Sequence, residues 1–253
     1  MCWVLNMKKK IPSISVQSLT GCAGELLVIL ENLNKMLPYV RIQSFPFAQS
    51  SNDDEGPVDI AFVEGSVSQP HDLKKLLSIR KRSKRLVAVG NCAVWGCVQK
   101  GACSKFDVEK MRDEVYGKDS KIEVMPASRI EDHVKVDVKL SGCPIDSTQL
   151  LAVTASLLKD QLPYITQKPV CLECKLRENP CILIEQNLPC LGPVTAAGCG
   201  ALCPSVGAPC YGCWGPSEEP QMDAMAQTLI ERGFRLSEVL SRPPTIGQPQ
   251  EMF

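Results

Sequence analysis

Eight cysteines are crowded into one 43-residue segment near the C-terminus of this 253-residue chain. Gly and Pro residues lie between them, and the segment shows little helical or strand periodicity, so we expect something other than an apolar core to hold it. The eight thiols divide into two sets of four, which is the ligand set of a structural zinc ion and of a [4Fe-4S] cluster alike. They are Cys171, Cys174, Cys181, Cys190, Cys199, Cys203, Cys210 and Cys213.

The spacing favours iron-sulfur clusters over zinc. Zinc ribbons favour two CxxC pairs joined by a strand-forming spacer, whereas the separation between successive cysteines keeps changing here. Prolines stand next to several cysteines, as they do in ferredoxins (Pro180, Pro189, Pro204 and Pro209). A zinc-stapled assembly module stays open as the alternative. Chain order does not assign each cysteine to a set, because in two-cluster ferredoxins one cysteine of each run binds the other cluster.

The part of the chain before this segment alternates short apolar strands with amphipathic helices, which predicts a parallel sheet. We expect an α/β domain over residues 12–165 and a loop-rich unit over residues 166–253. Leu26, Leu30, Leu33 and Leu37 are expected to share one face of the first helix. The stretch between residues 90 and 140 has no regular pattern. The expected strands are 14–16, 40–45, 58–63 and 85–89, and the expected helices are 25–37, 73–80, 147–159 and 222–232.

Three further cysteines each follow a predicted strand of this domain: Cys22, Cys92 and Cys143. Open parallel sheets gather the loops after their strands along one carboxyl edge, where ligands bind. Three thiols that are far apart in the sequence are therefore expected to converge.

Charge and hydropathy exclude several classes of partner. Lys+Arg and Asp+Glu both number 28, so no summed charge attracts nucleic acid or an anionic membrane. No run of 18 uncharged apolar residues is present and no secretory signal is visible at the start, so we expect a cytoplasmic protein without a membrane span. Fourteen cysteines in a reducing compartment point to metal or redox chemistry. No GxGxxG fingerprint lies between a strand and a helix, so a flavin or NAD site is expected only in a neighbouring subunit.

Several segments together resemble the small subunits of cytoplasmic (group 3) [NiFe]-hydrogenases, especially the sulfhydrogenase delta subunit and the viologen- and deazaflavin-reducing enzymes of methanogens. The resemblance implies a flavodoxin-like domain that holds a proximal [4Fe-4S] cluster, followed by a domain with two more, so three [4Fe-4S] clusters in all. The matching segments are 59–67 (DIAFVEGSV), 85–99 (RLVAVGNCAVWGCVQ), 141–144 (SGCP) and 169–215 (PVCLEC to CYGCWG).

By this resemblance, Cys22, Cys92 and Cys143 bind the proximal cluster. The fourth ligand departs from the family pattern, because Glu25 stands where the CxxC motif has its second cysteine. A carboxylate is a harder iron donor than a thiolate and would shift the cluster potential. Cys97, five residues after Cys92, is the alternative ligand. The position of Glu25 on the same turn favours Glu25.

The resemblance implies electron transfer to or from a nickel-iron site in a separate large subunit. This chain is expected to supply no catalytic residue, since its CxxC pairs lack the sequence context of nickel ligands. A downstream flavin- or iron-sulfur-containing subunit would exchange the electrons. A nickel-free oxidoreductase complex that uses the same kind of subunit is the alternative.

Overall fold

The computed structural model describes residues 11–100 and 107–240. Its centre is a parallel sheet of five strands in the order β2-β1-β3-β4-β5, which is the flavodoxin-like order. The predicted α/β fold is therefore confirmed. The strands are β1 (Ser13–Ser18), β2 (Arg41–Ser44), β3 (Val58–Glu64), β4 (Ser83–Val89) and β5 (Val138–Leu140).

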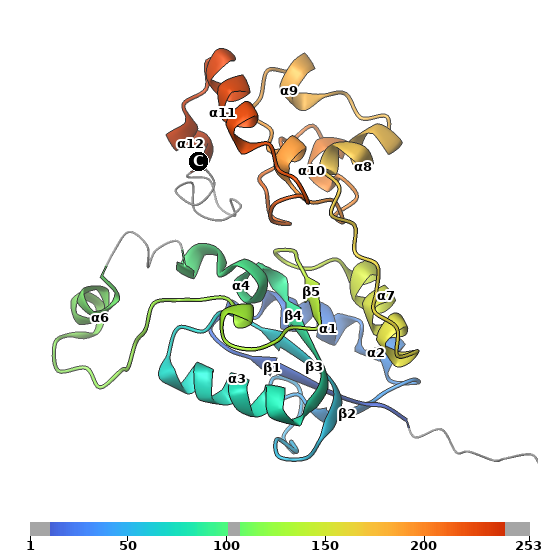
Figure 1. Cartoon of the computed structure of the whole chain (residues 1–253), viewed down its shortest axis with the longest axis vertical. Helices are drawn as coiled ribbons and strands as arrows, with labels where there is room; N and C mark the ends of the chain where they lie inside the picture. The colour runs from blue at the N-terminus through green and yellow to red at the C-terminus, as the bar shows by residue number, and fades with distance from the viewer. Residues whose placement is uncertain (1–10, 101–106, 241–253) are drawn as a thin grey trace, which may run out of the picture.

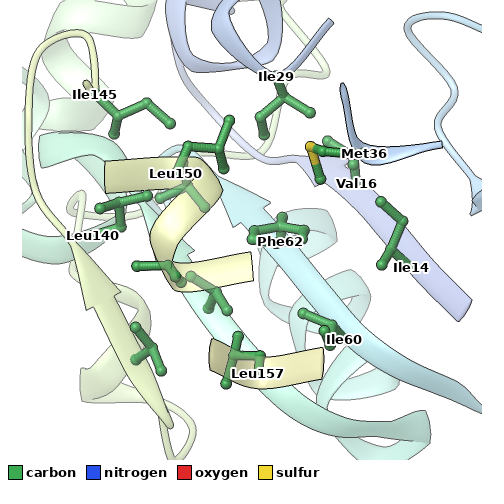
Figure 2. Packing of buried hydrophobic residues seen from close by; sticks show 14 of the residues in the cluster. Ile14, Val16, Ile29, Met36, Ile60, Phe62, Leu140, Ile145, Leu150 and Leu157 are labelled. Atoms are coloured by element: carbon green, nitrogen blue, oxygen red, sulfur yellow. The ribbon is translucent and has the colours of Figure 1, made fainter. Parts of the chain in front are cut away.

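Helices cover both faces of the sheet (Figure 1). On one face, α1 (Gly24–Glu31), α2 (Leu33–Met36) and α7 (Ser147–Leu158) pack on alternate residues of the strands. On the other face lie α3 (Pro70–Arg82), α4 (Gly90–Trp95) and the short helix η1 (Ile130–Asp132). Figure 2 shows Ile29, Phe62 and Leu150 lying together in the first of these cores, from a helix, the central strand and a second helix. The two faces of β3 thus anchor two separate apolar layers.

The single helix predicted over residues 25–37 is two helices in the structure. The break falls at Asn32, whose side-chain amide donates to the carbonyl of Val28 at 2.9 Å. Such local bonds compete with helix continuation. Because α2 is only four residues long and follows this break, the predicted leucine face is wrong: Leu30 is 39% exposed and Leu37 is 50% exposed. Leu26, Ile29 and Met36 form the buried face instead.

The stretch between residues 90 and 140 is more ordered than its sequence indicates. It contains α4, α6 (Val108–Tyr116) and the edge strand β5. Strand β5 is only three residues long, with buried Val138 and Leu140 on either side of exposed Lys139. The strand expected before Cys143 could not be given bounds from the sequence, because three residues are too few to display a strand period.

The cysteine-rich segment and the residues after it form a second unit with short helices: α8 (Val170–Leu176), α9 (Ile182–Glu185), η2 (Gly192–Val194), α10 (Leu202–Ser205), α11 (Met222–Glu231) and α12 (Leu236–Leu240). This unit has a small apolar core, which its sequence pattern did not predict. Val170 and Leu229 are fully buried in it beside the thiols of Cys190 and Cys210. Helix α11 lies beyond the last cysteine and supplies apolar residues that the cysteine-rich segment lacks.

The second unit lies against the first near the start of α4 (Figure 1). The side-chain amide of Asn91 donates to the carbonyl of Cys213 at 2.6 Å. The indole of Trp95 packs against Gly215, where any Cβ would collide with its Nε1. Gly215 also has φ of +79°, so glycine is needed there on two counts. Within residues 11–100 and 107–240, no helix combines the length and apolar character that crossing a bilayer requires.

Candidate metal centres

The three cysteines predicted to converge follow β1, β4 and β5 at one edge of the sheet: Cys22 and Cys143 lie in loops, and Cys92 lies in helix α4. The Cys22 loop adjoins the turn that carries Cys143. A methyl group placed on Gly24 would lie 3.4 Å from Sγ of Cys22 and 3.9 Å from Cβ of Pro144. Cys22 is exposed and Cys143 is half-buried, so the thiol group opens toward the surface on the Cys22 side.

Cys97 lies in direct contact with this group. Its thiol is in hydrogen-bonding contact with the thiols of both Cys92 and Cys143. The backbone achieves this by two consecutive left-handed residues after α4: Gly96 at φ +77° and Cys97 itself at φ +44°. A positive φ is uncommon for a residue other than glycine and occurs often at functional sites. The turn folds Cys97 back over Cys92.

These contacts and burial change the acidity of the thiols. The hydrogen bond from Cys143 lowers the pKa of Cys97, but contact with Cys92 and burial outweigh it and raise that pKa to about 11. The hydrogen bond to Cys97, burial, and the charges of Cys97 and Glu25 all raise the pKa of Cys143. Crowded thiols that hold their protons lose them when a metal binds, so metal affinity is expected to rise with pH.

Glu25 lies in the first turn of α1 with its carboxyl group against Gly90. A Cβ on Gly90 would collide with Oε1 of Glu25, and Gly90 has φ of +81°. The side chain is only 2% exposed, and its Oε2 has no hydrogen-bond partner within the described part of the chain. Burial, and to a smaller extent the charge of Glu64, raise the pKa of Glu25 to about 7 despite a backbone hydrogen bond that lowers it. A buried carboxyl oxygen without a partner is costly unless something else pairs with it.

A second buried carboxylate, Glu64, ends strand β3 beside the Cys22 loop and is 1% exposed. Ser18 donates its hydroxyl to Oε2 at 2.6 Å, and the backbone N–H of Ala23 donates to the same carboxylate. These bonds lower its pKa, yet burial outweighs them and raises it overall. Glu64 therefore holds the Cys22 loop onto the sheet.

Four cysteines of the second unit line one pocket of about 290 Å³: Cys171, Cys174, Cys181 and Cys190. A water molecule takes up roughly 30 Å³ in the liquid, so this space is much larger than one ion needs. The thiols lie around the wall of the pocket rather than at one point. Within residues 11–100 and 107–240, no three cysteine, histidine or carboxylate groups lie close enough together to bind a single metal ion. Burial and the charges of Cys190, Cys174 and Cys181 raise the pKa of Cys171 to about 11.

The other four cysteines are Cys199, Cys203, Cys210 and Cys213, and Cys210 lies between the pocket cysteines and Cys213. Burial, followed by the charges of Cys199, Cys203 and Cys143, raises the pKa of Cys213 to about 12. Cys210, which is buried, interacts in turn with Cys213, and its backbone N–H donates to Sγ of Cys190 at 3.2 Å. The pocket cysteines and the other four are therefore neighbours. Cys213 also lies close enough to Cys143 at the sheet edge for the two charges to interact.

Two polar residues that join these groups were not predicted from the sequence. Glu173, inside the first CxxC, accepts hydrogen bonds from the backbone N–H of Gly198 at 3.0 Å and of Ala201 at 3.1 Å. Its carboxylate lies 3.9 Å from Sγ of Cys199, so it links one group to the other. The other residue is Asn91, next to Cys92. The sequence shows an acidic residue within a CxxC and an amide next to a cysteine. No known spacing pattern identifies either residue as a link between thiol groups.

Comparison with known proteins places these features in a family. Residues 20–157 match the family described as NADH ubiquinone oxidoreductase, 20 Kd subunit. Sulfhydrogenase 2 subunit delta of Pyrococcus furiosus is 39% identical over 212 residues, which cover 83% of this chain and 88% of that protein. A subunit of the vhu F420-non-reducing hydrogenase of Methanocaldococcus jannaschii is 29% identical over 245 residues, 85% of each chain.

Among solved structures, an NAD+-reducing [NiFe]-hydrogenase in its H2-reduced state superposes with a TM-score of 0.52 at 23% identity, over 60% of this chain and 94% of that one. This likeness concerns the fold alone. The family match spans more than half of the chain and the sulfhydrogenase subunit aligns over most of it. The chain therefore belongs to the NADH ubiquinone oxidoreductase 20 kDa subunit family, and its predicted likeness to hydrogenase small subunits is confirmed.

Proposed function

We propose that this chain is the electron-transfer subunit of a [NiFe]-hydrogenase and holds three [4Fe-4S] clusters. The observation that carries the proposal is the succession of three thiol groups, from the sheet edge through Cys213 to the pocket that contains Cys181. Such clusters, when bound, accept and donate single electrons. The residues of this chain bind them, set their spacing and limit the access of water.

The sheet-edge group would hold the proximal cluster through Cys22, Cys92 and Cys143. Two side chains compete for the fourth position. The buried Oε2 of Glu25, which has no hydrogen-bond partner within the described residues, supports Glu25 as the fourth ligand, as the sequence favours. The contact of Cys97 with two of the other thiols supports Cys97, and thiolate is the softer donor. These contacts move our preference to Cys97.

The remaining clusters follow from the two groups of the second unit. The middle cluster would be held by Cys199, Cys203, Cys210 and Cys213, because Cys213 is close enough to Cys143 of the proximal site for their charges to interact. The terminal cluster would occupy the pocket lined by the other four cysteines, of which Cys181 is exposed at the surface. Electrons would leave or enter there. On this view residues 12–165 hold the proximal cluster and residues 166–253 the other two, although residues 101–106 and 241–253 lie outside the described residues.

The relatives named above are hydrogenase subunits, so we infer a hetero-oligomer in which a large subunit carries the nickel-iron site. A flavin- or iron-sulfur-containing subunit would meet the chain near Cys181. The balanced charge supports neither nucleic acid nor an anionic membrane as a partner, and we infer that the complex is cytoplasmic.

Anaerobic purification of the native complex tests this function. We expect nickel in a co-eluting large subunit, and about twelve iron atoms and about twelve acid-labile sulfides for this chain, at four of each per cluster. Full iron without nickel would instead identify a nickel-free relative of the complex. About two zinc atoms without sulfide would identify a zinc-stapled module. Either result contradicts the proposal.

Paired variants decide the fourth proximal ligand. We expect Cys97→Ala to lose or convert the proximal cluster, and Glu25→Gln, which keeps the shape of the side chain, to retain it. The measurement is the EPR spectrum of the reduced protein together with iron content. Glu25→Cys, which restores a CxxC, should alter the proximal signal and leave the other two clusters unchanged. Loss of the proximal signal in Glu25→Gln, with Cys97→Ala unaffected, would assign the position to Glu25.

A further inference from the structure

Asn91 makes a set of hydrogen bonds that the proposed function does not yet use. It stands at the second position of α4, immediately before Cys92, and is 4% exposed. Its backbone N–H donates to the carbonyl of Gly142 at 2.9 Å, and the N–H of Gly142 donates to its Oδ1 at 2.9 Å. Its Nδ2 donates to the carbonyl of Cys213 at 2.6 Å.

These bonds connect three cysteine-bearing segments through one side chain. Gly142 precedes Cys143 and lies 51 residues from Asn91, and Cys213 lies 122 residues away. The amide uses both its acceptor and its donor group in the contact, and buried hydrogen bonds of this kind cost more to break than exposed ones. A single hydrogen bond therefore joins the neighbour of Cys92 to Cys213.

The two thiol groups that this side chain links are also held together by a packing contact. Helix α4 and Gly215 meet in the same seam through Trp95. These contacts between α4 and residues 213–215 therefore determine the distance between the proposed proximal and middle clusters.

We propose that Asn91 is a positioning residue that fixes the spacing between the proximal and middle clusters and so sets the rate of the first electron transfer within this chain. The inference rests on the proposed function. Electron tunnelling slows steeply as the gap between redox groups widens, so a side chain that ties the two loops together controls the rate without binding iron itself.

Asn91→Asp in the native complex tests this role. Aspartate keeps an oxygen to accept the Gly142 N–H, but it turns a carboxylate oxygen toward the carbonyl of Cys213, so the two loops should separate. We expect iron and sulfide contents equal to wild type. We also expect a weaker splitting of the EPR signals by which neighbouring reduced clusters sense each other. After H2 is admitted, reduction of the middle and terminal clusters should be several-fold slower.

Asn91→Ala removes the bond to Cys213 together with the acceptor for the Gly142 N–H, without adding charge, and should give the same changes. The matched control is Asn32→Asp: Asn32 is 1% exposed and donates to Val28 and Ser147, neither of which carries a thiol, so cluster splitting should remain as in wild type.

Three outcomes would overturn the role of Asn91. Unchanged splitting and rate in both Asn91 variants would refute it, and so would a change in Asn91→Asp alone, which would reflect charge rather than spacing. Loss of iron would make Asn91 a folding residue of the thiol loop. A wild-type complex without clusters would instead refute the proposed function, which separates the two failures.

Discussion

Cys143→Ala is expected to abolish hydrogen-driven dye reduction by the complex while leaving the C-terminal clusters in place. Cys143 contacts Cys97 and lies within the field of both Glu25 and Cys213, so its thiol is the most central of the sheet-edge group. Removing it takes away one ligand of the proposed proximal site and interrupts the proposed electron path from the large subunit to the second unit. Iron should fall from about twelve to about eight atoms, at four per cluster.

The same substitution at Cys103 is the matched control for this experiment. That cysteine follows no predicted strand in the sequence, and it lies outside the described residues. We expect full iron content and wild-type dye reduction in Cys103→Ala. Undiminished activity in Cys143→Ala would remove Cys143 from the electron path and with it the proposed proximal site.

Phe62→Ala is expected to have the largest effect on folding. Phe62 is fully buried on the central strand β3, against residues of α1 and α7 (Figure 2). Truncating such a ring removes its burial and leaves a cavity, which costs about 3–5 kcal/mol. The urea concentration that halves the far-UV circular dichroism of the anaerobic protein should drop accordingly.

Phe47→Ala provides the comparison, because Phe47 is 49% exposed and stacks on Phe45 with ring centroids 6.3 Å apart. Its loss should cost no more than about 1 kcal/mol, the scale of one aromatic pair. Equal midpoints for Phe62→Ala and Phe47→Ala would mean that the core around β3 does not govern stability.

The sequence predicted those parts of the fold that have a long apolar period. Strands β1, β3 and β4 and helix α7 were recognisable, and their alternation implied the parallel sheet. Strand β5 was expected before Cys143 but could not be given bounds, because a three-residue strand has no measurable period, and Asn32 broke a helix that leucine spacing alone made continuous. Whether a short strand or a local side-chain bond forms depends on the residues packed around it. The periodicity of the sequence carries no information about those residues.

The candidate sites were likewise predictable only where they follow from the order of the strands. Three loops after strands could be placed at one edge because parallel topology requires it. The grouping that we propose for the eight C-terminal thiols could not be read from their order, because it depends on how the chain turns at residues such as Ala201, which has φ of +50°. The contact of Cys97 with Cys92 likewise depends on two left-handed residues in succession, which spacing does not reveal.

The small core under the C-terminal thiols makes helix α11 a support for the proposed metal sites, although it supplies no ligand to them. Leu229 of α11 shares that core with Cys190 and Cys210. A cavity introduced at Leu229 would loosen the loops that carry both thiols, so a substitution that removes no proposed ligand would change how firmly iron is retained. Inherited variation in this helix would then register as altered redox behaviour, although no donor atom had been exchanged.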